Sequence, residues 1–210
     1  MIRRTRTVLV GAISALTVGA LAAPASEANP LSLLPGSCGN QAESQVFAPW
    51  GDFNYYTPVP GGAFVSGTAP WTLSGGATVS PDNGTLVVNG ISDSNSLTLP
   101  ARGSATSPAN CTSIYHPTVR AFVRNTGSPT SRLIVEALYP GLLGGVQTAT
   151  LGSVTGSSSW QPTPAMTLLV SNLLSTLSLD QTAIAFRFAP ADDTGQWSID
   201  DVYLDPYRRG

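Results

Sequence analysis

Five aromatic residues lie close together in one short segment of the sequence, at Phe47, Trp50, Phe53, Tyr55 and Tyr56. Aromatic faces stack on the apolar side of pyranose rings, so a cluster of this kind is suited to carbohydrate binding. Small and polar residues interrupt the rings, and this irregular spacing indicates a loop rather than a core strand. Two interpretations stay open: Trp50, Tyr55 and Tyr56 bind a sugar, or the rings are buried at the edge of the fold.

Trp160 and two arginines are further candidates for ligand binding. Trp160 offers a second surface on which a sugar ring can stack. Arg120 and Arg124 share one face of an expected strand, where guanidinium groups can donate hydrogen bonds to hydroxyls or carboxylates of a ligand. The alternative is that these arginines are exposed to solvent or form salt bridges with Glu136 or with the aspartates near the C-terminus.

Residues suited to enzymatic catalysis are sparse. His116 is the only histidine, and no Gly-x-Ser-x-Gly motif occurs, which argues against serine hydrolase chemistry. Glycoside hydrolysis needs only two carboxylates, and Asp52, Asp93, Glu136 and Asp200 are the candidates, but acids in β-proteins mostly occupy turns and strand ends. All ten basic residues are arginines, which excludes Schiff-base and P-loop chemistry based on lysine. We therefore expect no enzyme activity.

The composition favours a folded, loop-rich, all-β domain. The formal charge of the 210 residues is 10 minus 12, or -2, and only 10% of the residues are charged, against roughly 25% in soluble proteins. This charge profile argues against a nucleic-acid partner. Glycine and proline together number 21 plus 17, or 38, a share below the roughly 25 to 30% that marks low-complexity disorder.

The first 28 residues have the pattern of a secretory signal peptide. Arginines within the first six residues precede an apolar stretch over 8–22, and small-residue cleavage patterns follow at 23–28. The apolar stretch is shorter than the roughly 20 residues that a membrane-spanning helix needs. We therefore expect a secreted bacterial protein with no transmembrane segment after signal removal, and a single domain over 29–210.

Two cysteines remain in the expected mature domain, Cys38 and Cys111. An exported protein in an oxidising compartment usually pairs two such cysteines, so we predict a disulfide between them. A structural zinc site needs four ligands at short spacings, which two isolated cysteines and one histidine do not supply.

Short apolar or alternating runs, separated by Gly, Pro, Asn and Ser, predict a two-sheet antiparallel β-sandwich of about ten strands. Clear strands are expected at 85–88, 96–99, 118–124, 132–139, 148–154, 182–189 and 196–204, and weaker ones around Phe47, Phe64, Trp71, Val79 and Met166. Trp71 and Trp197 lie in alternating strands and are expected in the core. The spacing of leucines near 168–179 fits one face of a short connecting helix.

Two segments resemble the opening and closing strands of galactose-binding-like, jelly-roll carbohydrate-binding modules. The first, over 61–77, has a glycine-rich turn, then Phe64 and Val65, and then a strand with Trp71; the second is Trp197–Leu204 with its Asp-Asp-Val core. The resemblance implies a jelly-roll sandwich in which these two segments are neighbours, and it implies function only weakly.

The whole chain also resembles a group of secreted actinobacterial proteins of uncharacterised function, which end in a similar Asp-Asp-Val-Tyr-x-Asp-Pro-Tyr-Arg-Arg stretch. That resemblance implies export and a sandwich architecture, and it implies no activity.

In many such modules a glutamate of the first segment and an aspartate of the closing strand hold a structural calcium. In this sequence Val65 stands at the glutamate position, so one carboxylate is missing. Asp200 or Asp201, with backbone carbonyls near Gly62, would have to coordinate the ion. The alternative is that an aspartate points inward and pairs with an arginine.

These observations lead to three functional hypotheses. The first is a secreted, non-catalytic binding module for a carbohydrate or cell-wall glycan. The second is a structural or adhesive cell-surface protein that binds another protein through an exposed sheet edge or face. The third, a glycan hydrolase, has the least support. The sequence does not determine the ligand or the oligomeric state.

Overall fold

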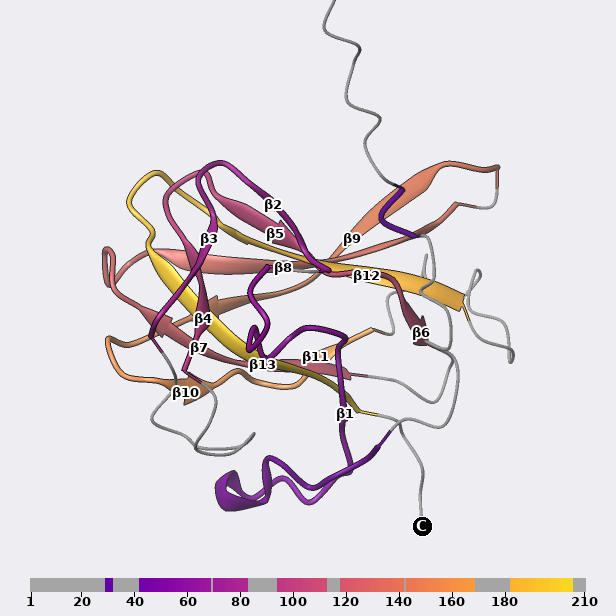
Figure 1. Ribbon diagram of the computed structural model, residues 1–210, viewed down its shortest axis with the longest axis horizontal. Coiled ribbons are helices and arrows are strands. Elements are labelled where there is room, and N and C mark those ends of the chain that lie inside the picture. The colour runs from indigo at the N-terminus through magenta and orange to yellow at the C-terminus, as the bar shows by residue number, and fades with distance from the viewer. Residues whose placement is uncertain are drawn as a thin grey trace, which may run out of the picture.

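The computed structural model describes residues 29–31, 42–68, 70–82, 94–112, 118–141, 143–168 and 182–205. These residues form one short 3-10 helix and thirteen strands, drawn in Figure 1. The elements are η1 (Ala48–Trp50), β1 (Thr57–Pro58), β2 (Thr72–Ser74), β3 (Thr78–Ser80), β4 (Ser96–Leu99), β5 (Ser104–Thr106), β6 (Asn110–Thr112), β7 (Thr118–Asn125), β8 (Arg132–Pro140), β9 (Val146–Thr155), β10 (Gln161–Pro162), β11 (Met166–Thr167), β12 (Thr182–Pro190) and β13 (Trp197–Asp205).

The strands form the two antiparallel sheets that the sequence predicts. A seven-stranded sheet has the order β10-β7-β13-β4-β3, with β1 paired to β13 and β11 paired to β7. A six-stranded sheet has the order β2-β5-β12-β8-β9, with β6 paired to β12. The main hydrophobic core lies between the sheets and draws buried side chains from both. The described residues contain no helix long and apolar enough to cross a membrane.

Alternation along the strands decides which side chains enter this core. In β7 the aliphatic residues Val119, Ala121 and Val123 belong to the main core, whereas Phe122 belongs to a second cluster on the opposite face. The same rule places every second residue of β12 in the main core, beginning at Ile184. One face of each strand is therefore assigned to the core between the sheets.

Trp197 lies at the centre of the core, as expected from its alternating strand. Its side chain is fully buried, and its indole Nε1 donates a hydrogen bond to Ser131 Oγ at 3.3 Å. Gly156 lies against the ring: a Cβ atom at this position would come within 2.5 Å of Trp197 Cζ3. Close packing here depends on a large residue opposite a glycine.

Two of the weaker expected strands are wrong. The backbone around Phe64 forms a series of turns, with Phe64 itself at a φ of 52°, and Phe47 precedes the 3-10 helix rather than lying in a strand. The glycines that flank Phe64 favour turns over a ladder of backbone hydrogen bonds.

The segment around Phe64 nevertheless lies next to β13, the closing strand of the sandwich, as the resemblance implied. Val202 donates a backbone hydrogen bond to the carbonyl of Gly62 at 3.2 Å, and Val59 donates one to the carbonyl of Val202 at 2.8 Å.

Several predictions fall outside the described residues. These are the signal peptide over 1–28, Cys38 and therefore its disulfide with Cys111, the strand at 85–88, His116, and the helix near 168–179 beyond Leu168. Cys111 itself is buried in β6. The signal peptide and the disulfide stay predictions.

Substitution of Trp197 by alanine should destabilise the fold by about 3 to 5 kcal/mol, because it removes a fully buried ring and leaves a cavity between the sheets. Chemical denaturation followed by circular dichroism measures the change. The control is Leu143→Ala at a fully exposed site, which should stay within about 0.5 kcal/mol of the parent. Equal stability of the two variants would contradict the assignment of Trp197 to the core.

Candidate functional site

A closed loop over 44–56 carries the aromatic cluster of the sequence. An antiparallel bridge between Ser44 and Tyr56 closes the loop at its base, with backbone hydrogen bonds of 3.0 and 2.8 Å in the two directions. η1 lies within the loop, has Pro49 in its first turn and is followed by Gly51, whose φ of 80° is left-handed. Proline at the start and a left-handed glycine at the end are what a short helical turn requires.

Two rings of the loop face inward and anchor it to the seven-stranded sheet. Phe47 and Tyr56 are fully buried and form the second hydrophobic cluster with Phe122, Trp160 and Tyr203. The Phe47 ring stacks on Phe122 at a centroid distance of 5.2 Å, and meets Tyr56 edge-on at 4.7 Å. The outer face of this sheet is thus covered by the loop at the position of these rings.

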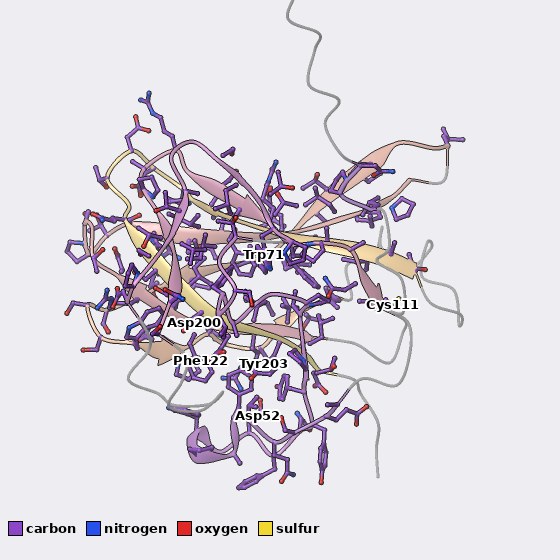
Figure 2. The ribbon with its side chains drawn as sticks, viewed as in Figure 1. Asp52, Trp71, Cys111, Phe122, Asp200 and Tyr203 are labelled. Carbon is purple, nitrogen blue, oxygen red and sulfur yellow. The ribbon has the colours of Figure 1, made fainter. Side chains whose placement is uncertain are left out.

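Asp52 is the polar centre of the same anchor. Its carboxylate accepts hydrogen bonds from the Tyr56 hydroxyl at 2.5 Å and from the backbone N–H of Asn54 at 3.1 Å, and it forms a salt bridge with Arg120. Arg120 also donates to the carbonyl oxygen of Thr163 from Nε and Nη2, at 3.0 and 2.8 Å. Figure 2 shows Asp52 on the lower loop, directly below Phe122 and Tyr203 of the sheet.

The surroundings of Asp52 shift the pKa values of three groups. Burial raises the pKa of Asp52, but hydrogen bonds from Tyr56, Asn54 and Arg120 outweigh it and hold this pKa below its ordinary value. Burial, with the hydrogen bond to the Asp52 carboxylate, raises the pKa of Tyr56 to about 12. Burial also raises the pKa of Asp205, which accepts a hydrogen bond from Thr118 and is repelled by the charge of Asp52.

Three other rings of the loop face solvent. Trp50 is 38% exposed, Phe53 68% and Tyr55 51%. The Gln45 side-chain amide donates a hydrogen bond to the backbone carbonyl of Phe53 at 2.7 Å. This bond joins the two sides of the loop. We call Trp50, Phe53 and Tyr55 the ring platform. Flat, exposed, braced rings of this kind can stack on the apolar faces of sugars.

The predicted ligand-binding residues therefore divide into two groups. Trp50 and Tyr55 reach the surface, whereas Tyr56 and Trp160 are buried, with 0% and 8% exposure. Phe53, which the prediction left out, is the most exposed ring of the loop. Phe53 and Tyr55 are exposed while the adjacent Tyr56 is buried, and this difference is visible only once the loop is placed on the sheet.

Arg120 and Arg124, which the sequence analysis considered as donors to a ligand, form ion pairs within the protein. Among the described residues, the salt bridges are Arg102–Asp193, Arg120–Asp52, Arg124–Asp82 and Arg187–Glu136. The Arg124 guanidinium also lies over the Trp160 ring, 5.4 Å from its centroid. Arg120 and Arg124 thus form salt bridges, as one alternative of the sequence analysis expects, but their partners are Asp52 and Asp82 rather than Glu136 or the aspartates near the C-terminus.

A pocket of about 430 Å³ lies between the turns over 58–70 and the bulge of β13. Asp201 lines it with a left-handed φ of 51°, and Phe64, also left-handed, lines the opposite side. This is the corner where the resemblance implies a structural calcium.

The residues of this corner do not fit that ion. Among the described residues that line the pocket, Asp201 is the only one with a carboxylate, and Val65, at the position where the resemblance places a glutamate, is 53% exposed. No cluster of three or more His, Cys, Asp or Glu side chains suited to a metal occurs in the described ranges. Calcium takes six to eight oxygen ligands, usually with several carboxylates.

The melting temperature should therefore be the same in chelator and in millimolar calcium, because an ion that binds the folded state weakly adds no stability. Differential scanning fluorimetry in the two conditions is the measurement. A rise of several degrees with calcium, abolished by Asp201→Asn, would show that the corner holds the ion after all.

Asp52→Asn and Asp205→Asn should move the melting temperature in opposite directions at pH 7. Asp52 has a lowered folded-state pKa, so its charge stabilises the fold above the unfolded pKa of about 3.9 and this contribution is lost as the pH falls through the folded pKa. Asp205 has a raised folded-state pKa, so its charge destabilises the fold at neutral pH and Asp205→Asn should raise the melting temperature.

Thermal melts from pH 7 down to pH 3 check both signs. The gain from Asp205→Asn should shrink as the pH falls through the raised folded-state pKa and disappear below about 3.9, because the Asp205 carboxyl is then largely protonated in both the folded and the unfolded state. A lower melting temperature for Asp205→Asn at pH 7 would contradict this account of the site.

Comparison with known proteins supports the fold. No protein-family model matches the chain, and no curated protein matches it in sequence. Among solved structures the chain is similar to the CBM22-1 xylan-binding domain from Paenibacillus barcinonensis Xyn10C, with 12% identity and a TM-score of 0.50 over 70% of this chain and 93% of that domain.

A second similar structure contains the CBM22-1 and GH10 modules of the Clostridium thermocellum endo-1,4-beta-D-xylanase 10B in complex with xylohexaose. The identity is 14% and the TM-score 0.52, and the match covers 70% of this chain but only 28% of that longer one. The chain thus has the jelly-roll β-sandwich fold of carbohydrate-binding modules.

Proposed function

We propose that this chain is a non-catalytic glycan-binding module and that the ring platform of Trp50, Phe53 and Tyr55 is its contact surface. The observation that carries the proposal is the exposure of three aromatic rings on one braced loop. Each of the other large aromatic rings in the described part of the chain is buried or half-buried, so these three stand apart from the packing of the fold.

The bracing of the loop supports a binding role. Ser44 and Tyr56 close it, Asp52 ties it to Arg120, and Gln45 holds the backbone at Phe53. A surface that is ordered before it meets its ligand loses less conformational entropy on binding. Exposed rings held in this way are typical of a recognition surface rather than of a region that only fills space.

The charges near the platform favour a neutral, polyhydroxylated ligand. The carboxylate of Asp52 is compensated by Arg120, so the loop presents rings and backbone amides rather than net charge. Asp52, Tyr56 and Arg120 already satisfy one another, which fits a structural role better than acid–base catalysis. The similar structures include a xylan-binding domain and modules in complex with xylohexaose, which is the kind of ligand that we propose here.

We also propose that the protein is secreted. The support is the signal-peptide pattern over 1–28 and the polysaccharide ligand, which a bacterial cell meets outside its membrane.

Retention on glycans tests the proposal. We expect the protein to be retained by at least one polysaccharide of a panel, and Trp50→Ala to weaken retention about tenfold or more, equivalent to about 1.4 kcal/mol of lost binding free energy. Depletion of the protein from solution measures retention. Leu143→Ala, which removes an exposed apolar side chain away from the loop, is the control and should bind as the parent does.

Absence of retention on every glycan would contradict the proposal. It would favour the second hypothesis of the sequence analysis, an adhesive or structural surface protein that binds another protein.

A further inference from the structure

We propose that the ring platform binds the flat face of an insoluble polysaccharide rather than a single soluble glycan chain. The inference rests on the proposed function and concerns the physical form of the ligand. It follows from where the loop lies, what fills the sheet behind it, and the charge around it.

The loop projects from the sandwich instead of lining a hollow. In Figure 1 the segment with η1 lies at the lower edge of the molecule, outside the two sheet layers. The pocket described above is lined by residues 58–67, Pro70 and 201–203, and none of the three platform rings contributes to it. A convex group of rings can contact a flat surface, whereas a single chain is best bound in a groove that surrounds it.

The sheet face behind the loop is already occupied. Phe47 and Tyr56 pack on Phe122 and Tyr203, and Phe47 stacks on Phe122 at a centroid distance of 5.2 Å. The Arg120 guanidinium lies 4.1 Å from the centroid of the Phe47 ring. A glycan chain would have to displace this packed cluster in order to lie across the sheet at this position, so the accessible rings are those on the outer side of the loop.

The three platform residues come from one short stretch of the loop. Phe53 and Tyr55 are two residues apart, so their Cα atoms are separated by at most about 7 Å, and Trp50 is at most about 11 Å from Phe53. Trp50 is also held from behind by Phe122, with ring centroids 5.2 Å apart. A compact, supported contact of this size suits neighbouring sugar rings on a surface.

The charge around the ring platform favours a polysaccharide surface over a membrane surface as the ligand. Binding to an anionic bilayer uses clusters of lysine and arginine next to the apolar side chains. The sequence has no lysine, and Arg120, the arginine that contacts this loop, is paired with Asp52. A neutral, hydroxyl-rich surface is therefore the better match.

The experiment compares insoluble and soluble forms of the same glycan. Depletion isotherms are measured on microcrystalline cellulose, chitin and insoluble xylan, and isothermal titration calorimetry is performed with cellohexaose, chitohexaose and xylohexaose. We expect saturable retention on at least one solid. The hexamer of the same linkage should bind at least a hundredfold more weakly, and an excess of it should not release the protein from the solid.

Ring variants show whether the platform makes the contact. Phe53→Ala and Tyr55→Ala should each weaken retention on the solid at least fivefold, and the double variant more than either. Both side chains are largely exposed, so the melting temperature should not change. Leu143→Ala should bind as the parent does.

Each of the other possible outcomes would contradict one specific part of the proposal. A hexamer that binds as tightly as the solid overturns the flat-surface inference and leaves the proposed function standing. Retention that does not depend on the ring variants overturns the assignment of the platform. Binding to phosphatidylcholine vesicles in place of the solids assigns the rings to lipid, and binding to neither solid nor hexamer overturns the proposed function itself.

Discussion

The salt bridge between Asp52 and Arg120 is the interaction on which the candidate site depends. Arg120 comes from the middle of the seven-stranded sheet and Asp52 from the loop, and Tyr56 and Thr163 satisfy their remaining hydrogen-bonding groups. Removing one member would leave a half-buried charge without its partner, which is more costly than never having the pair. The pair therefore fixes where the loop lies, and the loop fixes which rings are exposed.

The seven-stranded sheet has two packed faces, so the proposed binding surface lies on the loop that covers one of them rather than on the sheet. One face builds the main core with the six-stranded sheet, and the other carries Phe122 and Tyr203, which the loop covers with Phe47 and Tyr56. A sheet face that is covered in this way stabilises the fold through apolar burial. The rings on the outer side of the loop stay exposed, and the packing of the loop on the sheet determines where they lie.

The corner near Asp201 brings together the two segments on which the resemblance to carbohydrate-binding modules rests. The turns over 58–70 still hydrogen-bond to the closing strand, and both Phe64 and Asp201 keep left-handed backbone conformations that non-glycine residues rarely adopt. At the position where the resemblance places a glutamate, this chain has Val65, whose side chain is largely exposed. Backbone hydrogen bonds hold these segments together, and Phe64 is buried among the residues of the main core.

The sequence by itself determined the fold class and the strand faces, because alternation of apolar residues is a local property of each strand. Val119, Ala121 and Val123 could be assigned to the core in this way. It also located the aromatic loop, but not which rings are exposed. Only the tertiary structure decided that Tyr56 is buried and Phe53 exposed, and that Arg120 pairs with Asp52. These facts depend on contacts between residues 68 positions apart, which no local pattern encodes.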